Sequence, residues 1–141
     1  MSQVRDIIRD RQLFSVEEHE PVAAVARKMA DLHVGAILVL SGGRLRGIFS
    51  ERDLMHRVVL EQRDPASTPV SEVMTHEVST IDEGGSIEQA MEAMRSHNCR
   101  HLPVLHGTEV VGFLSMRDLM NFELARKTEE WHHLRSYIGS A

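Results

Sequence analysis

Two short stretches of the chain repeat one combination of glycine, serine, arginine and aspartate. They are Gly47-Ile48-Phe49-Ser50-Glu51-Arg52-Asp53 and Gly112-Phe113-Leu114-Ser115-Met116-Arg117-Asp118. A serine followed three residues later by an acid is typical of a capping box at the start of a helix. Capping leaves the glycine and the arginine unexplained, because the positively polarised start of a helix disfavours a cation. The arginine therefore indicates that something anionic binds nearby.

The same residue types are suited to binding a nucleotide. A hydroxyl, an arginine and the free N–H groups of a helix start can hold a phosphate, and a carboxylate can accept hydrogen bonds from both hydroxyls of a ribose. Catalysis would need a nucleophile with its base, or two carboxylates in contrasting surroundings. The chain offers instead a matched pair of motifs, which suits two separate ligands. We therefore predict a binding module that is not an enzyme.

The two motifs lie in an internal repeat with a period of 65 residues. Shifting residues 16–55 onto residues 81–120 gives eleven identical pairs without a gap. Upstream, VRDII at residues 4–8 resembles VSEVM at residues 70–74 once one residue is inserted. We predict a first copy over residues 1–61, a linker over 62–69, a second copy over 70–123 and a C-terminal helical extension over 124–141.

Hydrophobic periodicity predicts the same elements in both copies. Apolar residues recur at helical spacing from Val22 to Leu32 and again from Ile87 to Met94. Each helix precedes a short apolar strand, a glycine-containing turn and a returning strand that ends at the serine of the motif. The predicted unit is β-α-β-β-α, in the α/β (α+β) class. From Asp118 the chain is predicted to form one long helix to Ile138, because neither proline nor glycine interrupts it.

The composition excludes several classes of protein. The chain has 141 residues, 42% of them hydrophobic, and a formal net charge of −5, which opposes general attraction to nucleic acid. Its longest apolar stretch, residues 34–40, is far shorter than the roughly 20 residues that span a bilayer. With Cys99 as the single cysteine no intrachain disulfide can form, and the N-terminus lacks the pattern of a signal peptide. We predict a cytoplasmic protein without a membrane segment.

The chain resembles the cystathionine-β-synthase (CBS) domain family, whose domains occur as tandem pairs called Bateman modules. The resemblance covers nearly the whole chain and rests on the repeated order of elements, the opening VSEVMTHEVSTI, His101-Leu102-Pro103-Val104 and the two motifs. It implies two repeats related by a pseudo-twofold axis, with two clefts for adenosine-containing ligands. The expected ligands are AMP, ADP, ATP, NAD, NADH or S-adenosylmethionine. Modules of this family usually sense ligands and do not catalyse reactions.

The resemblance also implies which residues of this chain bind the ligand. The ribose hydroxyls would be held by Asp53 and Asp118, with Ser50 and Ser115 beside ribose or phosphate. The basic side chains near the phosphates would be Arg52, Arg100, His101 and Arg117. The residues enclosing the base would be Ser15, Val16, Ala36, Ile37, Thr80, Ile81, Leu102 and Pro103. The two clefts differ in charge, because the first copy has GAIL where the second has RHLP.

Three functions remain open to the sequence. The first is a sensor of an adenosyl ligand that reports to a separate, regulated protein. The second is a structural dimerisation or interaction module whose clefts stay empty. The third is a regulator that binds nucleic acid, and it ranks last because the net charge is acidic and neither a helix-turn-helix pattern nor a basic stripe is present.

Two further features bear on metal binding and on assembly. His97 and His101 are four residues apart, but a predicted helix end and strand start separate them, and no cluster of carboxylates or thiolates completes a site. We therefore predict no metal site. The extension carries Leu124, Trp131, Leu134 and Ile138 near one stripe of its helix and also contains Tyr137, which predicts a homodimer surface. The alternative is that this helix packs back on its own core.

Overall fold

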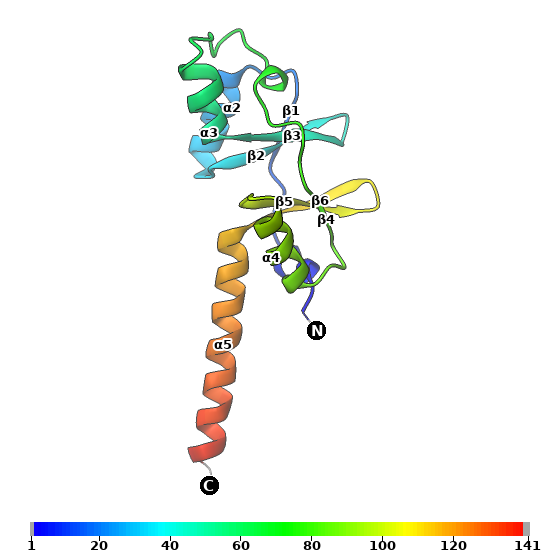
Figure 1. Ribbon diagram of the computed structural model, residues 1–141, viewed down its shortest axis with the longest axis vertical. Coiled ribbons are helices and arrows are strands. Elements are labelled where there is room, and N and C mark those ends of the chain that lie inside the picture. The colour runs from blue at the N-terminus through cyan, green and yellow to red at the C-terminus, as the bar shows by residue number, and fades with distance from the viewer. Residues whose placement is uncertain (1, 140–141) are drawn as a thin grey trace.

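The fold consists of two three-stranded sheets with accompanying helices and one long C-terminal helix (Figure 1). A computed structural model describes residues 2–139. The first repeat contains β1 Ser15–Glu17, α2 Val22–Leu32, β2 Ala36–Ser41, β3 Arg44–Ser50, α3 Glu51–Asp53 and η1 Leu54–Val59. The second contains β4 Ile81–Asp82, α4 Ile87–Ser96, β5 His101–His106, β6 Glu109–Ser115 and α5 Met116–Gly139. Two short helices precede the first strands of the repeats, α1 Val4–Ile8 and η2 Val70–Glu72.

Both sheets have the same topology, which confirms the α/β fold predicted from the repeat. In each sheet the first strand runs parallel to the second, and the second pairs antiparallel with the third. A register shift follows Val39 in one sheet and Val104, the equivalent residue, in the other. The hairpin turns use left-handed backbone, with φ of +56° at Gly42 and +63° at Gly107, which glycine adopts without steric cost.

Helices α2 and α4 each bury one apolar face. The buried positions are equivalent in the two repeats: Val22 and Ile87, Val25 and Ala90, Met29 and Met94. Their spacing of three and four residues follows the helical period, so one face reaches the core while the opposite face stays in solvent. The predicted helices therefore form where their apolar stripes meet the sheets.

The segment that opens each copy packs on the core of the other copy. Helix α1 supplies Val4 and Ile8 to the core of the second repeat. The opening of the second copy supplies Val70, Val73 and Met74 to the core of the first repeat. None of these five side chains is more than 7% exposed. Each repeat thus depends on the other for a complete hydrophobic core.

The glycine of each motif lets the exchanged segment pass close to the sheet. A Cβ atom on Gly47 would lie 2.4 Å from the backbone oxygen of Thr75, and one on Gly112 would lie 2.6 Å from Cδ1 of Ile8. Ile48 and Thr75 also exchange two backbone hydrogen bonds, of 3.0 and 2.8 Å. This close approach is the physical reason for the glycine, which helix capping does not explain.

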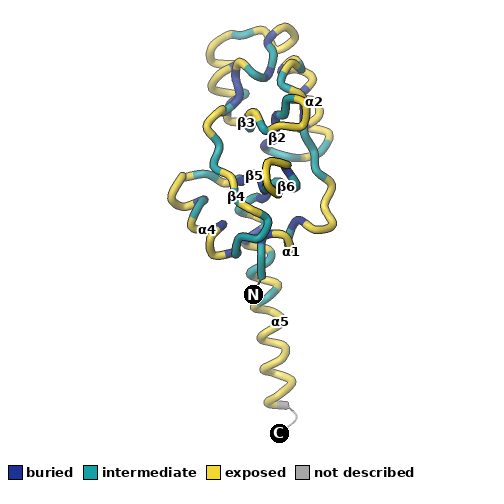
Figure 2. Tube along the Cα trace, turned by 90° about the vertical axis from the view of Figure 1, so that its right-hand side faces the viewer, coloured by how far each residue is buried: buried dark blue, intermediate teal, exposed yellow. Residues whose placement is uncertain are grey.

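Helix α5 continues far beyond the body of the protein (Figures 1 and 2). Its first turns pack on the second repeat, where Leu119 is fully buried. From Lys127 to Ile138 every side chain is exposed, as the yellow part of α5 shows in Figure 2. This part of the helix therefore does not pack back on its own core. Within residues 2–139, no helix is both long enough and apolar enough to cross a membrane.

Candidate functional site

A cleft of about 1220 Å³ lies between the two repeats. The second repeat lines it from the start of β5 and from the region where β6 joins α5. The first repeat lines it from residues 11–14, which precede β1, and from residues 33–37, which lead into β2. The cleft exists only because both repeats are present, since each provides one wall.

Asp118 lies in this cleft in the first turn of α5, where a capping box fixes its position. The Ser115 N–H donates to Oδ2 of Asp118 at 2.8 Å, and the Asp118 N–H donates to Oγ of Ser115 at 3.1 Å. Oδ1 of Asp118 lies 2.7 Å from Nη1 of Arg11. Burial opposes ionisation, but hydrogen bonds from Ser115 and Arg11 outweigh it and lower the pKa of the Asp118 carboxyl. The cleft therefore holds an anionic carboxylate at neutral pH.

Basic side chains line the same cleft, although the chain as a whole is acidic. Three arginines line the cleft, Arg11, Arg100 and Arg117, and the one other acid among the lining residues is Glu51. Guanidinium groups bind phosphate well because their N–H groups match its geometry. The Asp118 carboxylate therefore offers acceptors for the hydroxyl groups of a ligand. The guanidinium groups in the same cleft offer donors for an anionic group.

Much of the remaining wall of the cleft is apolar or aromatic. The ring of His101 stacks on Phe113 with 5.1 Å between the ring centroids. Burial lowers the pKa of His101 against the opposing effect of Asp118, so this ring is neutral at pH 7. Ala36 and Ile37 also line the cleft from the first repeat, although the Ile37 side chain belongs to the core of that repeat. A flat, uncharged group such as a base would find a suitable surface there.

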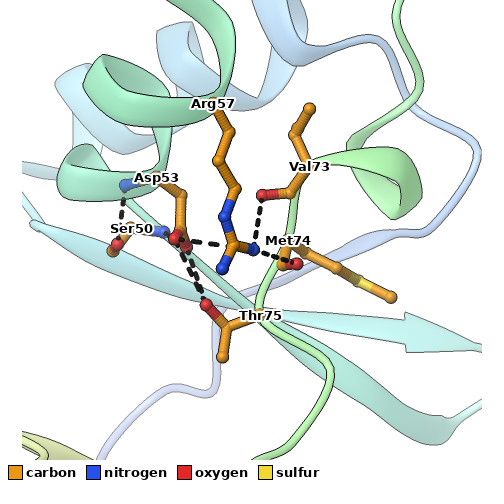
Figure 3. Close-up of polar contacts among 6 residues, drawn as sticks. All are labelled: Ser50, Asp53, Arg57, Val73, Met74 and Thr75. Atoms are coloured by element: carbon orange, nitrogen blue, oxygen red, sulfur yellow. Dashed lines mark hydrogen bonds and ion pairs between the residues drawn. The ribbon is translucent and has the colours of Figure 1, made fainter.

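Asp53, the equivalent of Asp118, has a different environment (Figure 3). Its carboxylate accepts a hydrogen bond of 3.2 Å from the Thr75 hydroxyl, and Nη1 of Arg57 lies 3.9 Å away. Nη1 of Arg57 also donates to the carbonyl oxygens of Val73 and Met74, at 3.3 and 2.6 Å. Asp53 is buried, caps the start of α3 and has its carboxylate satisfied by the protein itself.

The exchanged segments account for this difference between the two aspartates. The chain after η2 pairs with β3 at Thr75, which brings its hydroxyl onto Asp53. The chain after α1 instead forms a wall of the cleft at residues 11–14. Asp118 therefore faces an open cleft, whereas Asp53 faces a segment of its own chain.

The structure brings seven of the sixteen predicted site residues into the cleft: Ala36, Ile37, Arg100, His101, Ser115, Arg117 and Asp118. The other nine do not line it: Ser15, Val16, Ser50, Arg52, Asp53, Thr80, Ile81, Leu102 and Pro103. Val16 and Leu102 belong to the two hydrophobic cores, because alternate residues of a strand face opposite sides of a sheet. The assignment of all sixteen to a ligand stays a prediction.

Several residues of the cleft carry no signal in the sequence. Arg11 and Phe14 lie in the irregular chain between α1 and β1, outside both motifs. Asn121 follows the second motif on α5 and belongs to no pattern. Arg11 reaches Asp118 because α1 docks on the second repeat, and hydrophobic periodicity does not reveal that docking.

The histidines do not assemble into a metal centre within residues 2–139. No three His, Cys, Asp or Glu side chains of this part of the chain are grouped so that they could hold a metal ion. Nδ1 of His97 lies 2.9 Å from the carbonyl oxygen of Ala93 in its own helix, and His101 stacks on Phe113. The two histidines with helical spacing thus contact different neighbours.

Sequence comparison assigns the chain to a family. The CBS domain matches residues 4–60 and again residues 70–125. Over 119 residues the chain is 34% identical to the CBS domain-containing protein YhcV of Bacillus subtilis, covering 84% of each chain. The chain belongs to the CBS domain family, as a tandem pair, which confirms the resemblance seen in its motifs. Proteins built from such domains are typically regulatory and not catalytic.

Solved structures have the same fold. A CBS-domain protein from Burkholderia ambifaria MC40-6 is 32% identical, with a TM-score of 0.82 over 88% of this chain and 95% of that one. The CBS domain pair of protein MJ0100 has a TM-score of 0.79 over 89% of this chain and 98% of that one. That pair was solved in complex with 5′-methylthioadenosine and S-adenosyl-L-methionine, and at 18% identity its likeness to this chain shows the fold alone.

Proposed function

We propose that this protein is a regulatory module that binds an adenosine-containing ligand beside Asp118 and reports its presence to another protein. The observation that carries the proposal is an ionised carboxylate in an open cleft of about 1220 Å³ that is also lined by three guanidinium groups. Small-molecule sites commonly measure about 300–1,000 Å³, so a nucleotide would fit. The candidates are AMP, ADP, ATP, NAD, NADH and S-adenosylmethionine.

Each part of such a ligand has a suitable partner in the cleft. The ribose hydroxyls would donate to the Asp118 carboxylate, whose Oδ1 is paired with Arg11 in this structure. Arg11 is 48% exposed, so this ion pair is weak and the guanidinium can turn to a phosphate of the ligand. The base would lie between the wall at Ala36 and Ile37 and the ring of His101.

The class of ligand also has support from the fold family. Protein MJ0100 binds two adenosyl compounds on the same fold. The lining residues of the present cleft would recognise features that all adenosine compounds share, namely a ribose diol and a flat base. The Asp118 cleft is therefore proposed to accept an adenosyl ligand, and the phosphate chain would decide which one binds best.

Ligand binding would be transmitted through the chain that carries Arg11. This residue follows α1, whose Val4 and Ile8 are buried in the second repeat. Displacing Arg11 from Asp118 would remove an ion pair that ties the segment between α1 and β1 to the second repeat. A ligand shifts the arrangement of two repeats only if it binds the two arrangements with different affinity. A separate protein partner would read that shift.

The proposal includes no catalytic step, no nucleic acid and no membrane. It includes a homodimer in the cytoplasm, where the single cysteine, Cys99, would stay reduced. On the Asp53 side a structural role is favoured instead, because Thr75 and Arg57 already occupy its carboxylate.

Isothermal titration calorimetry tests the proposal. The folded protein, freed of carried-over nucleotide, is titrated with the six candidate ligands, and the Asp118→Ala and Asp53→Ala variants are titrated in parallel. We expect one dominant site that is lost in Asp118→Ala and retained in folded Asp53→Ala. Absence of heat with every ligand would favour a structural interaction module with empty clefts.

A further inference from the structure

The outer half of α5 lacks the packing that normally stabilises a helix in a protein. All twelve residues from Lys127 to Ile138 are exposed. An isolated helix of about 12–15 residues is only marginally stable in water, because most helical stability in proteins comes from burying an apolar face. A partner surface along its length would therefore stabilise the outer half of α5.

Five of the six large exposed apolar residues described on α5 form one stripe with the period of a coiled coil, and the sixth, Tyr137, lies beside that stripe. Five large apolar side chains on this helix are between 52% and 67% exposed: Met120, Leu124, Trp131, Leu134 and Ile138. Together with Lys127 they alternate in steps of four and three residues, which is the spacing of the a and d positions of a heptad. Leu124, Trp131 and Ile138 are then a positions, and the other three are d positions.

Two charged residues beside this stripe complement each other between helices and not within one. With Trp131 at an a position, Glu130 is at g of the preceding heptad and Arg135 is at e of the heptad that begins with Trp131. They are five residues apart, whereas side chains on one helix meet at spacings of three or four. In a parallel pair of helices a g residue faces the e residue of the following heptad on the partner. An antiparallel pair centred on the stripe would instead bring the two Glu130 side chains together.

We propose that α5 pairs with α5 of a second copy of this chain as a short parallel coiled coil. The seam, defined as Met120, Leu124, Lys127, Trp131, Leu134 and Ile138, covers the exposed stripe of each helix. Glu130 of each copy pairs with Arg135 of the other, so the contact forms twice. This dimer does not depend on ligand binding, and its tests do not use a ligand.

Lys127 is the one charged residue in the seam. A single polar residue at such a position lowers the stability of a coiled coil while it fixes the alignment of the two helices. Its long aliphatic stem can cover the seam while its ammonium group reaches solvent. The seam also spans fewer than three heptads, so we expect a dimer that dissociates on dilution.

Sedimentation equilibrium over a range of concentrations measures the dimer. We expect Trp131→Ala and Leu134→Ala each to raise the dissociation constant at least about tenfold, because Trp is a frequent interface anchor and a d-position Leu packs into the seam. Lys127→Leu should lower it. Two control variants should leave the dissociation constant unchanged. Glu129→Ala changes a residue of α5 that lies off the seam, and Val59→Ala removes an exposed apolar residue from η1. A monomer at all concentrations, or a dimer weakened by Val59→Ala and not by Trp131→Ala, overturns the proposal.

A charge exchange tests the parallel orientation. Glu130→Arg and Arg135→Glu should each weaken the dimer, and the double variant should restore it, because the pair is then reversed but still opposite in sign. A Leu134→Cys variant should form an interchain disulfide under mild oxidation, since equivalent seam positions face each other only in a parallel pair. The parent chain, with Cys99 alone, controls for other cross-links. Failure of the double variant to recover, together with no disulfide, overturns the parallel seam.

Discussion

The guanidinium of Arg11 and the carboxylate of Asp118 lie 2.7 Å apart in the cleft between the two repeats. This contact joins the chain that follows α1 to the first turn of α5. Its position matters because the ribose of a nucleotide would use the same carboxylate. In the proposed binding mode, a ligand with a ribose would compete with Arg11 for Asp118, and a ligand that also has a phosphate would offer the displaced guanidinium a new partner.

Replacement of Arg11 should change the preference among ligands. In Arg11→Ala, adenosine should bind about two- to fivefold more tightly because no ion pair has to break, and AMP should bind more weakly because a phosphate partner is lost. Titration calorimetry with both compounds measures the ratio. Arg9→Ala, which removes an exposed arginine paired with Asp6, is the matched control. An unchanged ratio in Arg11→Ala would contradict this role.

Loss of each aspartate should affect stability to different degrees. Asp53→Ala leaves the half-buried Thr75 hydroxyl without its acceptor and removes the reciprocal half of a capping box, so we expect a loss of about 2 kcal/mol in the free energy of unfolding. Asp118→Ala removes a cap in a more open site and should cost about 1 kcal/mol. Urea titrations monitored by circular dichroism measure both. Thr75→Val should reproduce part of the Asp53→Ala loss, and equal losses in the two aspartate variants would refute the difference in environment.

The lowered pKa of Asp118 makes stability depend on pH. Its folded pKa lies below the ordinary value of 3.8, so this carboxyl stabilises the fold fully above that pH and loses its contribution as the pH falls through the folded pKa. The free energy of unfolding is measured from about pH 3 to pH 6 for the parent and for Asp118→Asn. The difference between them should shrink toward the acid end. Asp31→Asn, at an exposed position on α2, controls for the loss of one charge, and a constant difference would contradict the prediction.

The two motif glycines should differ in their tolerance of a methyl group. Gly47→Ala places Cβ 2.4 Å from a backbone oxygen, which cannot move without breaking the pairing of Thr75 with β3. Gly112→Ala places Cβ 2.6 Å from Cδ1 of Ile8, which can rotate away, and 3.1 Å from Cβ of Ile8, which has to shift by only a few tenths of an ångström. We expect a loss of about 3 kcal/mol for the first and about 1 kcal/mol for the second. Thermal unfolding compares them, and the reverse order would show that the segments pack differently.

The exchange of opening segments can be tested by hydrogen exchange. Val70 belongs to the second copy in sequence but to the core of the first repeat in space. Val70→Ala should therefore speed amide exchange in α2 and β2 more than in α4 and β5, because its cavity lies beside the former. Val4→Ala should have the opposite pattern. Faster exchange in the variant's own sequence copy alone would contradict the exchanged arrangement.

Local sequence patterns determined the elements of this protein. The periodicity from Val22 to Leu32 and from Ile87 to Met94 predicted α2 and α4, and the serine and aspartate of each motif predicted the capping boxes. Such features depend on neighbours within a few residues, and their recurrence in the second copy strengthened the prediction. The family followed from the motifs together with the repeated order of elements.

Tertiary structure decided what surrounds each motif. Asp53 and Asp118 lie in identical local patterns, yet Thr75 occupies one carboxylate and Arg11 pairs with the other across an open cleft. The partners come from segments that dock on the opposite repeat, and neither capping nor periodicity encodes that docking. The repeated motif thus determines the same local backbone in both copies. The contacts of its aspartate depend on which distant segment the folded chain places next to it.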